Sequence, residues 1–366
     1  MTSLFAPLSL LRGPALRNRL VLAPLTNLQS NADGTLGEDE FNWLHMRAKS
    51  GYGLAMTCSV AVATDGVGFP GQLAAYDERH VTGLARIANV IRNHDGHSVV
   101  QLCHSGMRSP EDLIHAQPRC PSANEEFKAR EMTLAEVKQS IADFVSAAER
   151  CARAGFDGVE LHAAHGYLIG QFISSEINQR TDNYGGSLEN RSRILFDIID
   201  GIRSTCPRHF SVGVRLSPER FGMKLSEVRQ IAQRLFDEEK IDYLDMSLWD
   251  VFKEPDEAEF HGRTLVDCFT DLKRGNVRLG AAGKIATGAD CKRALEAGLD
   301  FVVIGRSAIL HHDFPQKVRS NPNFEPTAAP VSSDYLRSEG LGEAFIGYMA
   351  GWGFVSDMAP PATQAA

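Results

Sequence analysis

Short apolar runs rich in strand-forming residues alternate with helical patterns along almost the whole chain. Eight such runs cover residues 19–25, 54–62, 98–103, 158–162, 210–216, 241–247, 277–282 and 301–305. Strands that alternate with helices form parallel sheets with right-handed crossovers, and continuous apolar runs are typical of strands buried on both faces. Eight such units in roughly 300 residues predict a closed (β/α)8 TIM barrel, for which about 250 residues is usual.

An open doubly wound sheet is the alternative that the same alternation allows. It is disfavoured because no Gly-x-Gly-x-x-Gly pattern follows the first run. No linker or low-complexity segment divides the 366 residues. We therefore expect one domain over residues 1–366, with the barrel over about 19–320, an extension over about 321–366 and a frayed tail over 357–366.

The composition argues against several classes of function. The formal net charge of −8 disfavours nucleic acid or an anionic membrane as the main partner, because both need basic patches. The seven cysteines are scattered without a Cys-x-x-Cys pair, so we expect no disulfide framework, no structural metal and a reducing cytoplasmic location. No apolar run approaches the roughly 18 residues of a membrane helix. The start of the chain lacks the charge pattern of a signal peptide.

Two glycine–cation pairs stand where a barrel often binds phosphate. The active site of this fold lies at the C-terminal ends of the strands, and phosphate is commonly held by the last two loops. Gly283-Lys284 follows the seventh run, and Gly305-Arg306 follows the eighth. Glycine lets backbone N–H groups approach an anion, and the basic side chains add charge. Ordinary glycine turns are the alternative, but the agreement of the two loops favours phosphate.

Two histidines and a tyrosine lie close together after the fourth run, at His162, His165 and Tyr167. One interpretation is a pair of donors aimed at a single substrate oxygen, with the phenol as a proton donor. A second is a metal site completed by His104 or by a carboxylate. A third is a packed histidine at a strand end without a chemical role. Tyr167 favours the donor pair.

Taken together, the motifs resemble those of the old yellow enzyme family, the FMN-dependent ene-reductases. The matching segments are residues 16–26, 101–106, 160–174, 180–191, 213–217 and 304–306. Several ordered matches over most of the chain are more specific than any one of them. The resemblance implies a TIM barrel with an N-terminal β-hairpin lid, a non-covalently held FMN, and NADPH or NADH as reductant.

The resemblance also implies roles for individual residues. The implied flavin-binding residues are Ala23, Pro24, Leu25, Thr26, Ser59, Gln101, Arg215, Gly283, Lys284, Gly305 and Arg306. His162 and His165 would bond the activating oxygen of the substrate, and Tyr167 would protonate its α-carbon. Gln101 and Arg215 are polar residues in apolar runs. A buried Arg215 needs a partner, which could be the flavin or Glu160.

Departures from the family pattern fall around the substrate. Thr26 stands where one subgroup carries Cys, Met107 stands where many members carry Arg or Trp, and Leu28 replaces an aromatic or basic residue. Trp249, in the loop after the sixth run, could roof the substrate pocket. Trp352 could reach the pocket of a neighbouring subunit.

We therefore expect an enzyme that passes hydride from NAD(P)H through FMN to the activated C=C bond of α,β-unsaturated carbonyl or nitro compounds. One alternative is an FMN enzyme that performs desaturation or isomerisation. Others are a metal-dependent lyase or hydrolase built on His104, His162 and His165, and a flavin-binding barrel without catalysis. The implied partners are a small-molecule substrate and further copies of the chain, as a dimer or tetramer.

Overall fold

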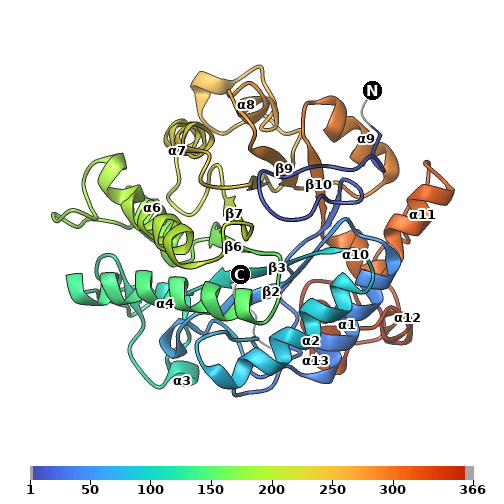
Figure 1. The fold of residues 1–366 in the computed structure, drawn as a ribbon, viewed down its shortest axis with the longest axis horizontal. Helices are drawn as coiled ribbons and strands as arrows, with labels where there is room; N and C mark the ends of the chain where they lie inside the picture. The colour runs from blue at the N-terminus through green and yellow to red at the C-terminus, as the bar shows by residue number, and fades with distance from the viewer. Residues whose placement is uncertain (1–2, 359–366) are drawn as a thin grey trace.

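The computed structural model describes residues 3–358, and eight parallel strands form a closed barrel at its centre (Figure 1). Around the barrel, the strands follow the order β1-β10-β9-β8-β7-β6-β3-β2. Their bounds are β1 (Leu20–Leu22), β2 (Leu54–Ala61), β3 (His97–Cys103), β6 (Gly158–Ala163), β7 (Ser211–Leu216), β8 (Tyr243–Ser247), β9 (Arg278–Ala282) and β10 (Phe301–Ile304). Each of the eight apolar runs contains one strand, so the predicted (β/α)8 barrel is confirmed.

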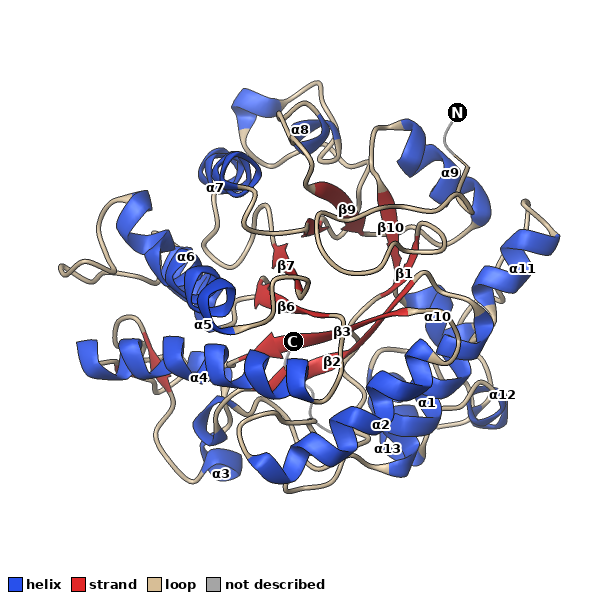
Figure 2. Ribbon diagram, viewed as in Figure 1, coloured by secondary structure: helices blue, strands red, loops and turns tan. Residues whose placement is uncertain are grey.

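Helices surround the barrel as an outer layer (Figure 2). The helices between successive barrel strands, and the one after the last, are α1 (Glu38–Ser50), α2 (Val81–Arg92), α4 (Leu134–Arg153), α6 (Leu188–Thr205), α7 (Leu225–Glu238), α8 (Asp267–Thr270), α9 (Gly288–Glu296) and α10 (Arg306–Leu310). Smaller elements are α3 (Glu111–Ile114), β4 (Arg119–Cys120), β5 (Arg130–Glu131), α5 (Leu168–Ile173), α11 (Phe314–Ser320), α12 (Ser333–Ser338) and α13 (Glu343–Gly351). Only α8 is much shorter than its helical pattern in the sequence, which predicts a helix over about residues 264–273.

Local sequence explains where the long helices begin. The hydroxyl of Thr133 accepts from the backbone N–H of Glu136, whose carboxylate in turn accepts from the N–H of Thr133, so a capping box starts α4. Thr287 and Asp290 repeat this arrangement at α9. One face of α4, which includes Phe144, is buried against the barrel layer. Burial of such faces supplies most of the stability of these helices.

The N-terminal end of the barrel is closed by the loop over residues 8–16. Leu8 and Leu16 form an antiparallel bridge with two backbone hydrogen bonds of 2.9 Å. Both side chains are buried in a cluster that includes Leu54 and Phe301, the first residues of β2 and β10. The expected β-hairpin lid is represented by this single bridge, so a true hairpin stays unconfirmed.

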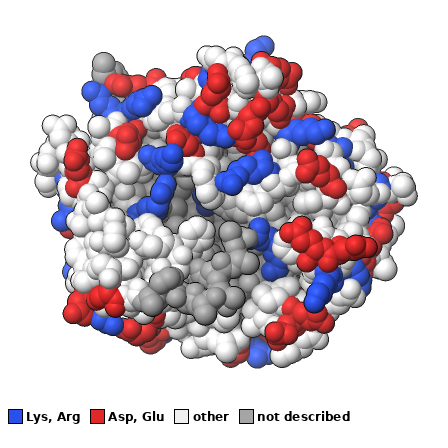
Figure 3. Space-filling model, turned by 180° about the vertical axis from the view of Figure 1, so that it is seen from behind, with Lys and Arg blue, Asp and Glu red and all other residues white. Residues whose placement is uncertain are grey.

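The segment after α11 returns to pack on α1. The rings of Trp43 in α1 and Phe345 in α13 meet edge-on at 5.0 Å, and the N–H of Gly342 donates to Oε1 of Gln29 at 2.7 Å. That the whole chain is one domain stays a prediction, and most of the tail expected to fray lies outside the described residues. No helix in residues 3–358 has the length and apolarity needed to cross a membrane. Acidic and basic side chains are interspersed over the face in Figure 3.

Candidate active site

The end of β6 and the turn after it bring His162, His165 and Tyr167 together. His162 Nε2 lies 3.3 Å from His165 Nδ1, and the Tyr167 ring packs edge-on against the His162 ring at 4.8 Å. His165 has a φ of 58°, an uncommon conformation for a residue other than glycine. The N–H of His165 donates to Ser217 Oγ at 3.1 Å, which fixes this turn. An oxygen atom that lies beside the two rings and displaces this contact can therefore bond both nitrogens.

Burial and nearby cations keep the two imidazoles neutral. Burial, followed by Arg215 and Arg108, lowers the pKa of His165 to about 3. Burial, followed by His165, holds the pKa of His162 well below its ordinary value. Burial also raises the pKa of the Tyr167 phenol, so it keeps its proton. Since Ser247 Oγ lies 2.7 Å from His165 Nε2 and can donate to it, Nδ1 is free to carry the hydrogen of His165.

Arg215 is buried in β7 and pairs with an aspartate on the next strand. Its Nε lies 3.2 Å from Oδ2 of Asp245 in β8, its register partner. Glu160, the partner considered from the sequence, instead accepts a hydrogen bond of 2.8 Å from Gln101 Nε2. Asp245 was missed, although an acidic residue in the apolar run 241–247 was a usable signal.

The two buried carboxylates below this site have unsatisfied oxygens. Neither oxygen of Asp245, nor Oε2 of Glu160, has a hydrogen-bond partner among the described residues. Burial and, to a smaller extent, the charge of the nearby Asp245 raise the pKa of Glu160 to about 8. Burial also raises the pKa of Asp245, while Arg215 opposes the shift. Unsatisfied buried polar groups are uncommon, and they concentrate where a ligand or a chemical step uses them.

The two glycine–cation pairs meet at the ends of neighbouring strands β9 and β10. Gly283 has a φ of 148°, and a Cβ there would lie 2.9 Å from the carbonyl carbon of Trp249, so only glycine fits. A Cβ on Gly305 would lie 3.8 Å from Leu25 and 3.9 Å from Ala23, beside the segment that follows β1. Bare backbone at Gly305 leaves a cradle that a side chain would fill.

The basic residues of the two pairs are in different situations. Lys284 Nζ lies 2.9 Å from Asp250 Oδ2, whereas Arg306 is exposed at the start of α10. Together with the Gly305 cradle and the buried Arg215, this arrangement fits a ligand that carries both a phosphate and a flat polar ring. The flavin-binding roles of all the expected residues, Pro24, Thr26 and Ser59 included, stay predictions.

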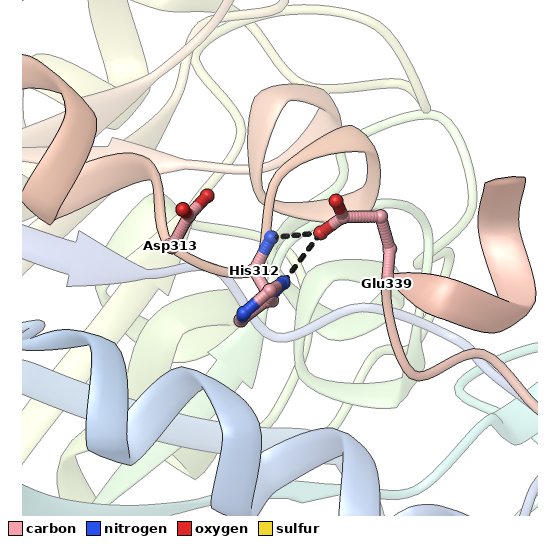
Figure 4. A group of neighbouring side chains, drawn as sticks. All are labelled: His312, Asp313 and Glu339. Atoms are coloured by element: carbon pink, nitrogen blue, oxygen red, sulfur yellow. Dashed lines mark hydrogen bonds and ion pairs between the residues drawn. The ribbon is translucent and has the colours of Figure 1, made fainter.

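The metal-site interpretation fails on geometry. His104 Nε2 lies 3.5 Å from Asp65 and does not join His162 and His165. In residues 3–358 the one group of three possible metal ligands is His312, Asp313 and Glu339, near α10 to α12 (Figure 4). There the backbone N–H and Nδ1 of His312 both lie 2.6 Å from the same Glu339 oxygen, which explains the group as a structural contact.

A cavity of about 330 Å³ opens beside His165, and Trp249 forms part of its wall. Trp249 is 56% exposed, so its place at the pocket agrees with the expectation, while contact with a substrate stays a prediction. Trp352 is 53% exposed and packs on Tyr348 with ring centroids 6.2 Å apart. Its proposed reach into another subunit is untested.

Comparison with known proteins decides the family. Residues 3–325 match the NADH:flavin oxidoreductase / NADH oxidase family. The chain belongs to this family. It is 36% identical over 327 residues to the probable NADH-dependent flavin oxidoreductase YqiG of Bacillus subtilis, covering 86% of this chain and 87% of that protein. It is 31% identical over 336 residues to an NADPH dehydrogenase of Bacillus cytotoxicus, covering 88% and 94%.

Solved structures agree with this assignment. The old yellow enzyme homologue from Zymomonas mobilis superposes with a TM-score of 0.78 at 27% identity, covering 92% of this chain and 96% of that one. The chain is accordingly an FMN-dependent NAD(P)H oxidoreductase of the old yellow enzyme family. The resemblance stated from the sequence is confirmed.

Proposed function

We propose that this oxidoreductase is an ene-reductase that acts on the activated C=C bond of α,β-unsaturated carbonyl or nitro compounds. The observation that carries the proposal is the neutral imidazole pair with a protonated phenol beside it. Nε2 of His162 and Nδ1 of His165 lie 3.3 Å apart and bond each other, and a carbonyl or nitro oxygen that displaces this bond can accept from both. Two donors on that oxygen act most strongly when enolate charge develops in the transition state.

Each residue of the site has a distinct part in this proposal. Bound FMN, reduced by NAD(P)H, would supply the hydride that the β-carbon accepts. Tyr167 gives its phenolic proton to the α-carbon, because the neutral imidazoles are fully used as hydrogen-bond donors. Gln101 and Arg215 bond the polar edge of the flavin, and the Gly305-Arg306 pair holds its phosphate. A small activated alkene as substrate and a homo-oligomeric assembly are part of the same proposal.

The test separates the two half-reactions in an anaerobic stopped-flow experiment. With cyclohexenone or maleimide as oxidant, Tyr167→Phe should slow flavin reoxidation by about 10²- to 10⁴-fold. Flavin reduction by NADPH should change little. The matched control is Tyr184→Phe, because the Tyr184 hydroxyl bonds Asp197 at 2.8 Å on α6. Equal slowing of both half-reactions, or a flavin-loaded wild type that reduces neither compound, would contradict the proposal.

A further inference from the structure

The cavity beside His165 lies between the loops that follow β7 and β8. Its walls include Ser217, Arg220, Phe221, Ser247 and Trp249. The ring of Phe221 packs edge-on against the His165 ring at 6.3 Å, so the loop after β7 is fixed relative to the histidine pair. A volume of about 330 Å³ is at the lower end of the range for small-molecule sites.

Backbone strain is concentrated around this cavity. Ten non-glycine residues in the described chain have a positive φ, and four of them line the cavity. They are His165, Arg220, Phe221 and Trp249, at 58°, 70°, 54° and 63°. Such conformations are unfavourable in bulky residues and persist where the surrounding structure imposes them, often at ligand sites. The strain indicates that the positions of these side chains matter.

A tight turn presents Arg220 to the cavity. Phe221 and Gly222 both have positive φ, and the N–H of Met223 donates to the carbonyl of Arg220 at 2.9 Å, as in a type I′ turn. The Arg220 guanidinium then lies 4.4 Å from the centre of the Trp249 ring. An arginine stacked on an aromatic face keeps the N–H groups on its edge available for a planar anion.

The acidic groups of the cavity wall are engaged by another residue. Lys253 pairs with Glu219, and its Nζ lies 3.0 Å from Asp256 Oδ1. Lys253 is the main cause of the lowered pKa of Asp256, and the charge of Arg220 contributes less. Within residues 3–358 Arg220 takes part in no ion pair. The cavity therefore contains a positioned cation whose donors are available.

We propose that Arg220, held on Trp249, is a subsite for an anionic group on a ligand whose reactive end reaches His165. The inference rests on the proposed function, because it takes His165 as the place where the activating oxygen binds. Two sources have the required chemistry: a carboxylate on the alkene substrate and the 2′-phosphate of NADPH. Arg220 thereby sets which substrates or reductants the enzyme prefers.

The experiment compares Arg220→Gln with wild type on trans-3-benzoylacrylate and its methyl ester, which differ in one negative charge. If the carboxylate is the source, kcat/KM for the acid falls about tenfold or more, while kcat/KM for the ester changes less than about threefold. If the dinucleotide is the source, the rate of flavin reduction by NADPH falls about tenfold relative to the rate with NADH. Arg220→Lys should restore part of either loss, because lysine keeps the positive charge but lacks the paired N–H donors of a guanidinium.

The matched control is Arg234→Gln, since Arg234 also stacks on an aromatic ring, that of Phe196 at 3.6 Å, but on the outer helices. Equal losses for acid and ester with an unchanged NADPH preference would overturn the subsite, as would no change in any arm. The oxidised holoenzyme is also titrated with the acid and with the ester, and the change in the flavin spectrum measures binding. This binding measurement tests the Arg220 subsite separately from the ene-reductase activity. Wild type that binds the acid tightly but reduces neither probe refutes the ene-reductase. A binding preference for the acid that Arg220→Gln removes still supports the subsite.

Discussion

Two buried aspartates near β8 lie three residues apart in the chain and differ in almost every contact. Asp242, just before the strand, accepts from Arg12 at 3.2 Å, from Arg203 at 2.6 Å and from a backbone N–H at 2.7 Å. Asp245, within the strand, has only its ion pair with Arg215, and neither oxygen has a hydrogen-bond partner among the described residues. Asp242, at the N-terminal end of the barrel, is satisfied internally, whereas Asp245, inside the strand that leads to the site, keeps oxygens that a ligand could use.

The histidines repeat this difference. His97, the first residue of β3, has both ring nitrogens engaged, by the Pro14 carbonyl at 3.1 Å and by Ser211 Oγ at 2.9 Å. His162 and His165, at the opposite end, bond each other at 3.3 Å, and a substrate oxygen can displace that contact and bond both rings. The same residue type thus fixes structure at one end and remains available for chemistry at the other.

The largest stability effect is expected at Asp242. Asp242→Asn leaves the guanidinium groups of Arg12 and Arg203 without their anion, and breaking such a buried pair costs about 3 kcal/mol or more. The thermal midpoint of unfolding should fall clearly, while flavin content of the folded protein stays the same. If Asp242→Asn destabilised the protein no more than Asp245→Asn does, the proposed difference between the two aspartates would be wrong.

A pH effect is expected from His165. Its pKa is about 3 in the folded protein and about 6.5 in an unfolded chain. As pH falls below about 6.5, the unfolded state binds a proton that the folded state does not. The stabilisation that the neutral His165 gives to the folded state is therefore lost progressively between about pH 6.5 and 3.

The free energy of unfolding of the wild type falls between pH 7.5 and 5.5. In His165→Asn this fall should be smaller by roughly 1 kcal/mol. Chemical denaturation at the two pH values measures the difference. Substitution of the exposed His115 by Asn is the control and should leave the pH dependence as in wild type. A wild-type pH dependence in His165→Asn would show that the histidine pair is not held neutral by burial.

A smaller stability change, but a functional one, is expected for Asp245→Asn. The substitution removes a buried anion that lacks hydrogen bonds, which stabilises the protein. It also removes the ion-pair partner of Arg215, which destabilises it. Because the two effects oppose each other, the free energy of unfolding should change by about 1 kcal/mol or less. Arg215 would then present its full charge to the reduced flavin. The two-electron reduction potential should rise by about 30 mV or more, measured by dye-coupled titration. A lowered potential would contradict the placement of Arg215 at the flavin.

The smallest change in stability is expected for Lys284→Ala, about 0.5 kcal/mol, because its ion pair with Asp250 is exposed. The affinity for FMN should fall, but less than in Arg306→Ala, since Asp250 already offsets the charge of Lys284. Fluorescence titration of the apoprotein with FMN measures both. A larger loss of affinity in Lys284→Ala would assign the main phosphate contact to the β9 loop.

The barrel was predictable because burial on both faces makes each strand an uninterrupted apolar run, as in residues 210–216 and 301–305. The histidine pair and Tyr167 were predictable because they are near in sequence and need only one turn to meet. The short α8 was not predictable, since a long loop with its own contacts, including Thr264 to Asp267, occupies part of the expected helix.

The pairings across strands were harder to foresee. Arg215 could have faced Glu160 on one side or Asp245 on the other, and the choice depends on the stagger of the closed barrel, which no local pattern encodes. The pair of Lys284 with Asp250 joins two loops and depends on their path. The sequence therefore identified the strands and most candidate positions, but not which side chains would be satisfied.

The loop over residues 8–16 has a consequence for how the protein is made. Arg12 reaches Asp242 over 230 positions of sequence, and Arg278 donates to the carbonyl of Ser9 over 269. The segment that contains Ser9 and Arg12 is synthesised before β8 and β9, so it can find these partners only after both strands have been made. Contacts of such long range form slowly. Closure of the N-terminal end of the barrel by this loop is accordingly a late event in folding. In a nascent chain that stalls before residue 242, the loop lacks its partners and that end stays open.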